Sequence, residues 1–155
     1  MPAQSNAEVG AARRILLVAA PFVAGAVAVA MTFAALHDAL PSRIATHFTA
    51  DGTANSFSSP GSAIAQYCLI FVIEFVGLLV AAFSIKQRTG GQRSLIVLSW
   101  ALAAATAYDL IAAMQASTQT SGSQAITLPL YQLAIAVGVG VAAAAIGWLL
   151  GRRRA

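Results

Sequence analysis

Charged side chains are scarce in this chain, and their scarcity excludes a water-soluble fold. Only 9% of the 155 residues are Asp, Glu, Lys or Arg, whereas 59% are apolar. A soluble domain carries about a quarter charged residues. Five acidic and nine basic side chains cannot cover a domain of this size without leaving large apolar patches in water. The composition therefore predicts an integral membrane protein whose first partner is the lipid bilayer.

The sequence also lacks the residue sets from which several kinds of site are built. Cys68 is its one cysteine, so neither an intrachain disulfide nor a thiolate metal cluster can form. There is no nucleophile with a partnered base, no glycine-rich phosphate loop and no metal motif, so we expect neither an enzyme nor a bound cofactor. The basic residues lie at the edges of apolar runs instead of on one face, which argues against nucleic-acid binding.

Four long apolar runs are present, and each is long enough to cross a bilayer as a helix. About 20 residues suffice at roughly 1.5 Å per residue. Glu74 interrupts the second run and Asp109 the third. The first run has a competing interpretation as a cleaved secretory signal, because Arg13 and Arg14 precede it, but signal cores are only about 7 to 15 residues long. The predicted spans are residues 15–36, 64–85, 95–116 and 128–150.

The basic residues also predict the orientation, because Lys and Arg concentrate on the cytoplasmic side of membranes. With four spans, eight of the nine basic residues lie on one side and only Arg43 lies on the other. A three-span protein would place Arg13 and Arg152 on opposite sides. Arginine outnumbers lysine eight to one, which is typical of a GC-rich bacterial genome. We expect an all-α protein of four transmembrane helices in an up-down bundle, in a bacterial plasma membrane, with both termini cytoplasmic.

The remaining segments are predicted from their polarity. Residues 1–12 have no periodicity and are expected to be a disordered cytoplasmic tail, followed by a single membrane domain over 13–155. Residues 117–127 carry no ionisable group and resemble a spacer. The external loop 37–62 carries both histidines and is the one extramembrane segment rich enough to hold a site.

Small and aromatic residues mark the cytoplasmic ends of the last two spans. Trp100 and Trp148 lie where interfacial aromatic anchors are expected. Gly147 and Gly151 form a G-x-x-x-G pair, which lets the fourth helix approach a neighbour closely. That neighbour is either another helix of the same bundle or, alternatively, a second copy of the chain.

The external loop carries the pattern L-P-x-R-I-x-T-H-F-x-x-x-G-x-x-x-x-F-x-S directly after the first span. This pattern resembles the signature loop of the domain of unknown function 1648 at the N-terminus of SdpI-type bacteriocin-immunity membrane proteins. Ala45 stands where that family usually has a second proline, and Asn55 where it usually has an aspartate. The matching residues are Leu40, Pro41, Arg43, Ile44, Thr46, His47, Phe48, Gly52, Phe57 and Ser59.

The resemblance implies a binding, sensing or immunity-type membrane protein. Members of the SdpI type confer immunity to a secreted toxic peptide and can signal its presence by sequestering a repressor at the membrane. The implied partner is therefore a secreted peptide or another membrane protein. The loop residues on which this recognition would depend are Pro41, Arg43, Ile44, Thr46, His47, Phe48, Gly52 and Phe57.

A metal site in this loop is the alternative, since His37, Asp38, His47 and Asp51 all have suitable ligand atoms. The ten-residue spacing of the two histidines matches no established ligand spacing, so we expect no metal. We expect His47 to be hydrogen-bonded within the loop. We expect His37 to lie at the C-terminal end of the first helix, where the helix dipole favours a cation.

Four polar residues within the second and third spans form the other candidate site. Ionisable residues inside a span usually face the bundle interior and often mark function. Glu74 and Asp109 lie at similar depths, and Tyr67 shares a helical face with Glu74. With Thr106 they predict a polar track, which would suit a small proton- or cation-coupled transporter or an accessory subunit of a membrane complex. The structural alternative is that the acids only fix helix pairing.

Overall fold

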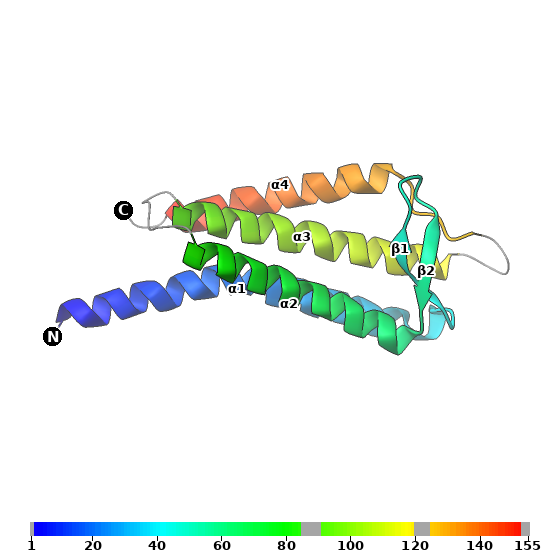
Figure 1. Cartoon of the computed structure of the whole chain (residues 1–155), viewed down its shortest axis with the longest axis horizontal. Helices are drawn as coiled ribbons and strands as arrows, with labels where there is room; N and C mark the ends of the chain where they lie inside the picture. The colour runs from blue at the N-terminus through cyan, green and yellow to red at the C-terminus, as the bar shows by residue number, and fades with distance from the viewer. Residues whose placement is uncertain (1, 85–90, 120–124, 153–155) are drawn as a thin grey trace.

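The computed structural model describes residues 2–84, 91–119 and 125–152, and over these ranges the chain is mostly helical (Figure 1). Its four long helices are α1 (Pro2–Leu36), α2 (Pro60–Ser84), α3 (Gly91–Thr118) and α4 (Tyr131–Arg152). Each belongs to a helical stretch long and apolar enough to cross a membrane, and the first stretch runs beyond α1 to Ala39. These stretches are Ala12–Ala39, Pro60–Ala82, Arg93–Thr118 and Tyr131–Arg152. The four predicted spans are confirmed.

The helix ends differ from the predicted ones for local reasons. α1 begins at Pro2, so residues 2–12 are helical instead of the disordered tail that the sequence predicts. Proline is tolerated in a first helical turn, and a helix already formed in the membrane extends at low cost. α2 begins at Pro60 for the same reason, four residues before the predicted span. Ile85, the predicted end of that span, lies outside the described residues.

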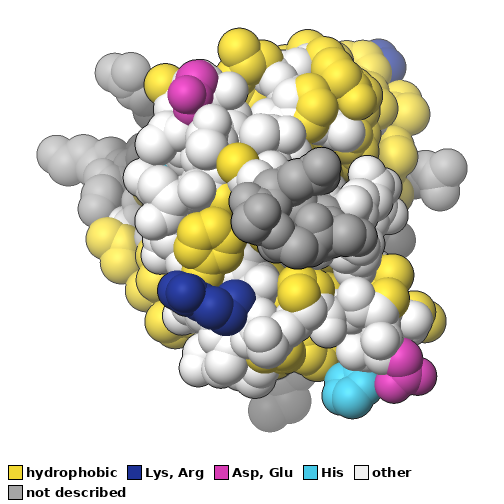
Figure 2. All heavy atoms as spheres, turned by 90° about the vertical axis from the view of Figure 1, so that its right-hand side faces the viewer, with side chains coloured by type: hydrophobic (Ala, Val, Ile, Leu, Met, Phe, Trp, Pro, Cys, Tyr) yellow, Lys and Arg dark blue, Asp and Glu magenta, His cyan; other side chains and the backbone are white. Residues whose placement is uncertain are grey.

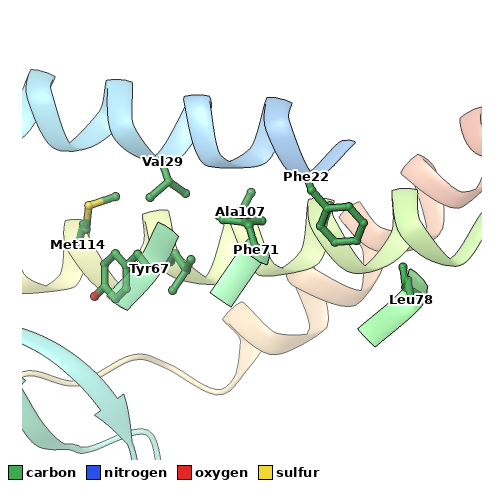
Figure 3. Packing of buried hydrophobic residues seen from close by; sticks show 9 residues of the cluster. Phe22, Val29, Tyr67, Phe71, Leu78, Ala107 and Met114 are labelled. Atoms are coloured by element: carbon green, nitrogen blue, oxygen red, sulfur yellow. The ribbon is translucent and has the colours of Figure 1, made fainter. Parts of the chain in front are cut away.

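α3 is the central helix, because α1, α2 and α4 all pack against it (Figure 1). The core lies where α1, α2 and α3 meet. Figure 3 shows Phe22 and Val29 of α1 facing Tyr67 and Phe71 of α2. Side chains on the outer faces remain exposed, as expected of surfaces solvated by lipid: Val137 is 65% and Val23 63% exposed.

Glycines bring α4 against α3. A Cβ added at Gly147 would lie 3.0 Å from the ring of Trp100, and one at Gly140 would lie 3.1 Å from the carbonyl oxygen of Ala101. Gly140 and Gly147 therefore allow close packing of α4 against α3 inside the bundle.

The loop after α1 is a β-hairpin, which adds a small sheet to the fold predicted as all-α. After a short 3-10 helix, η1 (His37–Ala39), strands β1 (Ile44–Phe48) and β2 (Ala54–Ser58) pair in antiparallel register, with Ile44 opposite Ser58 and Phe48 opposite Ala54. We call residues 43–58, the hairpin with the residue before it, the hairpin cap. It lies across one end of the helix bundle, at the right of Figure 1.

Candidate functional site

The inner side of the hairpin cap is bonded to the bundle through Ala45. The hydroxyl of Tyr67 in α2 donates to the carbonyl oxygen of Ala45 at 2.8 Å, and the N–H of Ala45 donates to Oγ of Ser117 in α3 at 3.2 Å. Ile44 and Ala45 are fully buried. Both backbone groups of a buried residue are thus satisfied by side chains of two different helices, as burial requires.

The tip of the cap is bonded to the segment that leads into α4. Gly52 accepts a hydrogen bond from the N–H of Leu128 at 2.8 Å, and the N–H of Ala54 donates to the carbonyl oxygen of Ile126 at 2.9 Å. Thr53 and Thr127 form an antiparallel bridge between these bonds. Residues 126–128 are therefore held against the hairpin tip by an isolated bridge and two hydrogen bonds. α4 starts at Tyr131 instead of the predicted residue 128.

Gly52 is required at the tip for two reasons. Its φ of 84° is a left-handed conformation that glycine adopts at little cost. A Cβ at this position would also lie 2.2 Å from the carbonyl oxygen of Leu128. The glycine of the signature loop is therefore what lets the segment before α4 approach the hairpin.

Asp51 closes the turn beside this glycine. Its carboxylate accepts a hydrogen bond from the Thr49 hydroxyl and a second, at 3.0 Å, from the N–H of Thr53. These bonds, the Thr49 bond first, lower the pKa of the Asp51 carboxyl below its ordinary value, since they favour the charged form. The exposed carboxylate is thus a structural part of the turn.

The outer side of the cap presents polar side chains held by their neighbours. His47 donates from Nδ1 to the amide oxygen of Asn55 across the two strands at 2.6 Å, as expected of a histidine within the loop fold. The guanidinium of Arg43 lies 5.3 Å above the ring of Phe57. His47, Asn55 and Arg43 are exposed. Figure 2 views this end of the molecule, where a few charged side chains lie among hydrophobic and uncharged surface.

The eight loop residues on which recognition is predicted to depend therefore divide by role. Ile44 and Gly52 attach the cap to the rest of the protein, whereas Arg43 and His47 face outward. Thr46 is half-buried and bonds weakly to Ser56 across the strands, at 3.4 Å. The remaining three, Pro41, Phe48 and Phe57, are half-buried.

The two histidines have separate partners. His37 lies in η1 directly after α1 and pairs with Asp38 at 3.3 Å, with its ring edge-on to Phe33. Among the described residues, no three side chains of His, Cys, Asp or Glu form a group that could hold a metal ion.

The polar residues within the spans are only partly brought together. The Thr106 hydroxyl of α3 donates to Oε1 of Glu74 in α2 at 2.6 Å. Tyr67, predicted to share a polar track with them, instead uses its hydroxyl on Ala45 of the cap. Two buried carboxylate oxygens, Oε2 of Glu74 and Oδ1 of Asp109, have no hydrogen-bond partner.

Several contacts at the site give no signal in the sequence. Ser117 lies in the segment that the sequence predicts to be a spacer, yet it is 1% exposed and binds β1. Tyr108 of α3 donates to the side-chain oxygen of Gln132 in α4. A serine, a tyrosine and a glutamine are common in apolar helices and at their ends, so only the pairing in space distinguishes them. Ile126 and Thr127 are β-branched, which is the one local hint of a strand before α4.

Comparison with known proteins gives one match. None of the curated proteins matches the chain significantly, and no solved structure does. The matching family model is a domain of unknown function, DUF1648, and it covers most of α1, the hairpin cap and the first half of α2. Residues 16–72 of this multi-pass membrane protein thus match the DUF1648 family model, as the signature loop predicts.

Proposed function

We propose that this protein is a binding or sensing protein of the membrane, of the immunity type, whose hairpin cap recognises a peptide segment or another membrane protein. The observation that carries the proposal is the division of the cap into a fixed inner side and an exposed outer side. A two-stranded hairpin alone is marginally stable in water. Here α2, α3 and the segment before α4 all bond to it.

Fixing the hairpin favours recognition because a rigid surface loses little conformational entropy on binding. Arg43 lies over Phe57 and His47 bonds to Asn55, so both outward side chains are already oriented. The Arg43 guanidinium supplies hydrogen-bond donors suited to backbone carbonyls or carboxylates of a peptide. In the tautomer whose Nδ1 donates to Asn55, Nε2 of His47 can accept a hydrogen bond from a peptide N–H. The resemblance of the loop to that of SdpI-type immunity proteins supports the same assignment.

Site-specific photo-crosslinking in intact cells tests this proposal. A photoreactive residue replaces exposed Ser56 of the cap in one variant and lipid-facing Val137 of α4 in a matched control. We expect a discrete adduct from position 56 only, and its loss when His47→Ala or Arg43→Ala is added. Adducts that are absent from position 56, or equally abundant from position 137, would contradict recognition by the cap.

The proposal includes a bacterial plasma membrane as the location and an external position for the cap. The distribution of arginines between the two ends supports this orientation. In a Cys68→Ser background, a cysteine replacing Asn55 should react with an impermeant reagent in intact cells, whereas one replacing Ala12 should react only after lysis. The reverse pattern would place the cap in the cytoplasm.

A second function, proton- or cation-coupled transport, is favoured by one observation. Oε2 of Glu74 and Oδ1 of Asp109 are buried carboxylate oxygens without a hydrogen-bond partner, and such atoms accept a proton or a cation. Glu74→Gln should then abolish pH-dependent flux in proteoliposomes while His47→Ala leaves it unchanged. If the cap recognises a partner and the protein does not transport, Glu74→Gln should leave the adduct at position 56 unchanged.

A further inference from the structure

α3 begins and α4 ends at the end of the bundle opposite the hairpin cap (Figure 1), and three arginines from three helices gather there. Arg13 of α1 donates from Nη2 to the carbonyl oxygen of Leu150 near the end of α4, at 3.2 Å. The guanidinium carbons of Arg93 in α3 and Arg152 in α4 lie 4.6 Å and 4.1 Å from the centre of the Trp148 ring. We call Arg13, Arg93 and Arg152 the arginine end.

The charge of the arginine end is not balanced by the described part of the protein. Nε and Nη2 of Arg93 are buried and have no hydrogen-bond partner. The one ion pair among the described side chains joins His37 to Asp38 beside the cap. Buried donors of a charged group without partners are costly. An anion at this place would satisfy them.

The position of Arg93 strengthens the case for an anion. It lies in the first turn of α3, which contains no acidic residue. The N-terminus of a helix already carries partial positive charge, so the guanidinium adds to it and an anion is favoured by both. A Cβ added at Gly151 would lie 3.3 Å from Cγ of Arg93, so this glycine lets the Arg93 stem lie close to the end of α4.

We propose that the arginine end binds the phosphate of an anionic membrane lipid of the phosphatidylglycerol class. Arg93 and Arg152 donate to the phosphate, and Trp148 holds both guanidinium groups in place. The neighbouring surface of α4 is apolar and exposed at Leu149, 54%, and Ile146, 49%, which suits acyl chains below a headgroup. Tryptophan rings and lipid phosphates occupy the same interfacial depth, so a lipid fits this site better than a free ion.

Native mass spectrometry of the full chain tests the proposal. The protein is released from nanodiscs that contain phosphatidylcholine with a minor fraction of phosphatidylglycerol, and the bound lipids are identified. We expect preferential retention of phosphatidylglycerol, weakened about tenfold by Arg93→Gln because a charge-assisted bond is lost. Arg43→Gln is the matched control, since it removes the same charge and a similar ring contact at the opposite end.

A second variant tests lipid retention independently of Arg93. Arg152→Gln should also weaken retention, and it serves if Arg93→Gln does not fold. Equal retention of the two lipids by the wild type, or equal losses in the Arg93 and Arg43 variants, would overturn the proposal. A separate experiment adds inorganic phosphate to the lipid-bound protein in neutral detergent. Displacement of the lipid by phosphate at millimolar concentration would show a free-anion site and would overturn the assignment to lipid.

Discussion

The Tyr67 hydroxyl and the carbonyl oxygen of Ala45 are joined by a buried hydrogen bond of 2.8 Å that ties a transmembrane helix to the hairpin cap. Tyr67 is only 2% exposed, so water cannot replace it as a donor. The residue predicted to belong to a polar track inside the membrane is thus a support for the candidate recognition surface. The bond therefore holds β1 against α2.

Replacing Tyr67 with phenylalanine should loosen the cap without disturbing the spans. The change keeps the ring in the core and leaves the Ala45 carbonyl unsatisfied, at a cost of about 1–3 kcal/mol. Hydrogen exchange of the cap amides should accelerate, while exchange within α1 and α4 stays slow. Tyr131→Phe is the control because that side chain is 61% exposed. Equal effects of the two variants would refute a specific role for the bond.

A side chain at position 52 should detach the cap from the segment before α4. Gly52→Ala places a Cβ against the Leu128 carbonyl and forces alanine into a left-handed conformation, which costs about 1 kcal/mol before the clash is counted. Limited proteolysis should then cut residues 125–130. Gly61→Ala, where an added Cβ meets nothing within 4 Å, should remain resistant. Cleavage of neither variant would mean that the approach of Leu128 is not needed.

The turn at the tip should weaken in acid because Asp51 is charged in the folded state. Its pKa is lowered on folding by the bonds from Thr49 and Thr53, so the stabilisation is fully present above the unfolded pKa, near 3.8, and is lost as pH falls through the folded pKa. Amide exchange at Gly52 and Thr53, corrected for intrinsic rates, should be constant from neutral pH to about the unfolded pKa and faster below it. Asp51→Asn should remove that pH dependence. An unchanged profile in the variant would assign it to another group.

A large side chain at position 147 should push α4 away from α3. A Cβ there meets the Trp100 ring at 3.0 Å, so Gly147→Leu should lower the melting temperature in detergent and disturb the bond from Trp100 Nε1 to the Leu17 carbonyl. Overpacking of this kind costs about 1–3 kcal/mol. Gly138→Leu, on an open face of the same helix, should be neutral. If Gly147→Leu left the melting temperature unchanged, Gly147 would have a role outside the bundle.

The spans were predictable because their signal is local and strong. A run of some 20 apolar residues needs no partner to identify it, since lipid is the solvent on every side. Arg43 is the single basic residue between α1 and α2, whereas the other eight basic residues flank the opposite ends of the spans. This difference in charge distinguishes the two ends of the bundle from sequence alone. The signature pattern located the candidate site to within the hairpin cap.

The hairpin and its attachments were not predictable from local signals. β2, with the sequence Ala-Asn-Ser-Phe-Ser, has little strand propensity and is stabilised by pairing with β1. Ala45 binds Ser117, which is 72 residues away. Arg152 lies one turn after Trp148 and their contact is readable from spacing, but the contact of Arg93 with the same ring depends on how α3 and α4 pack.

The bridge between the hairpin tip and residues 126–128 fixes the point from which α4 starts. The helix that follows has 22 residues and is about 33 Å long, and its far end carries Trp148. The hydrogen bonds of Ile126 and Leu128 to the cap lie within five residues of Tyr131, the first residue of this helix. One continuous stretch of chain therefore joins the hairpin tip to the indole of Trp148 at the opposite end of the bundle.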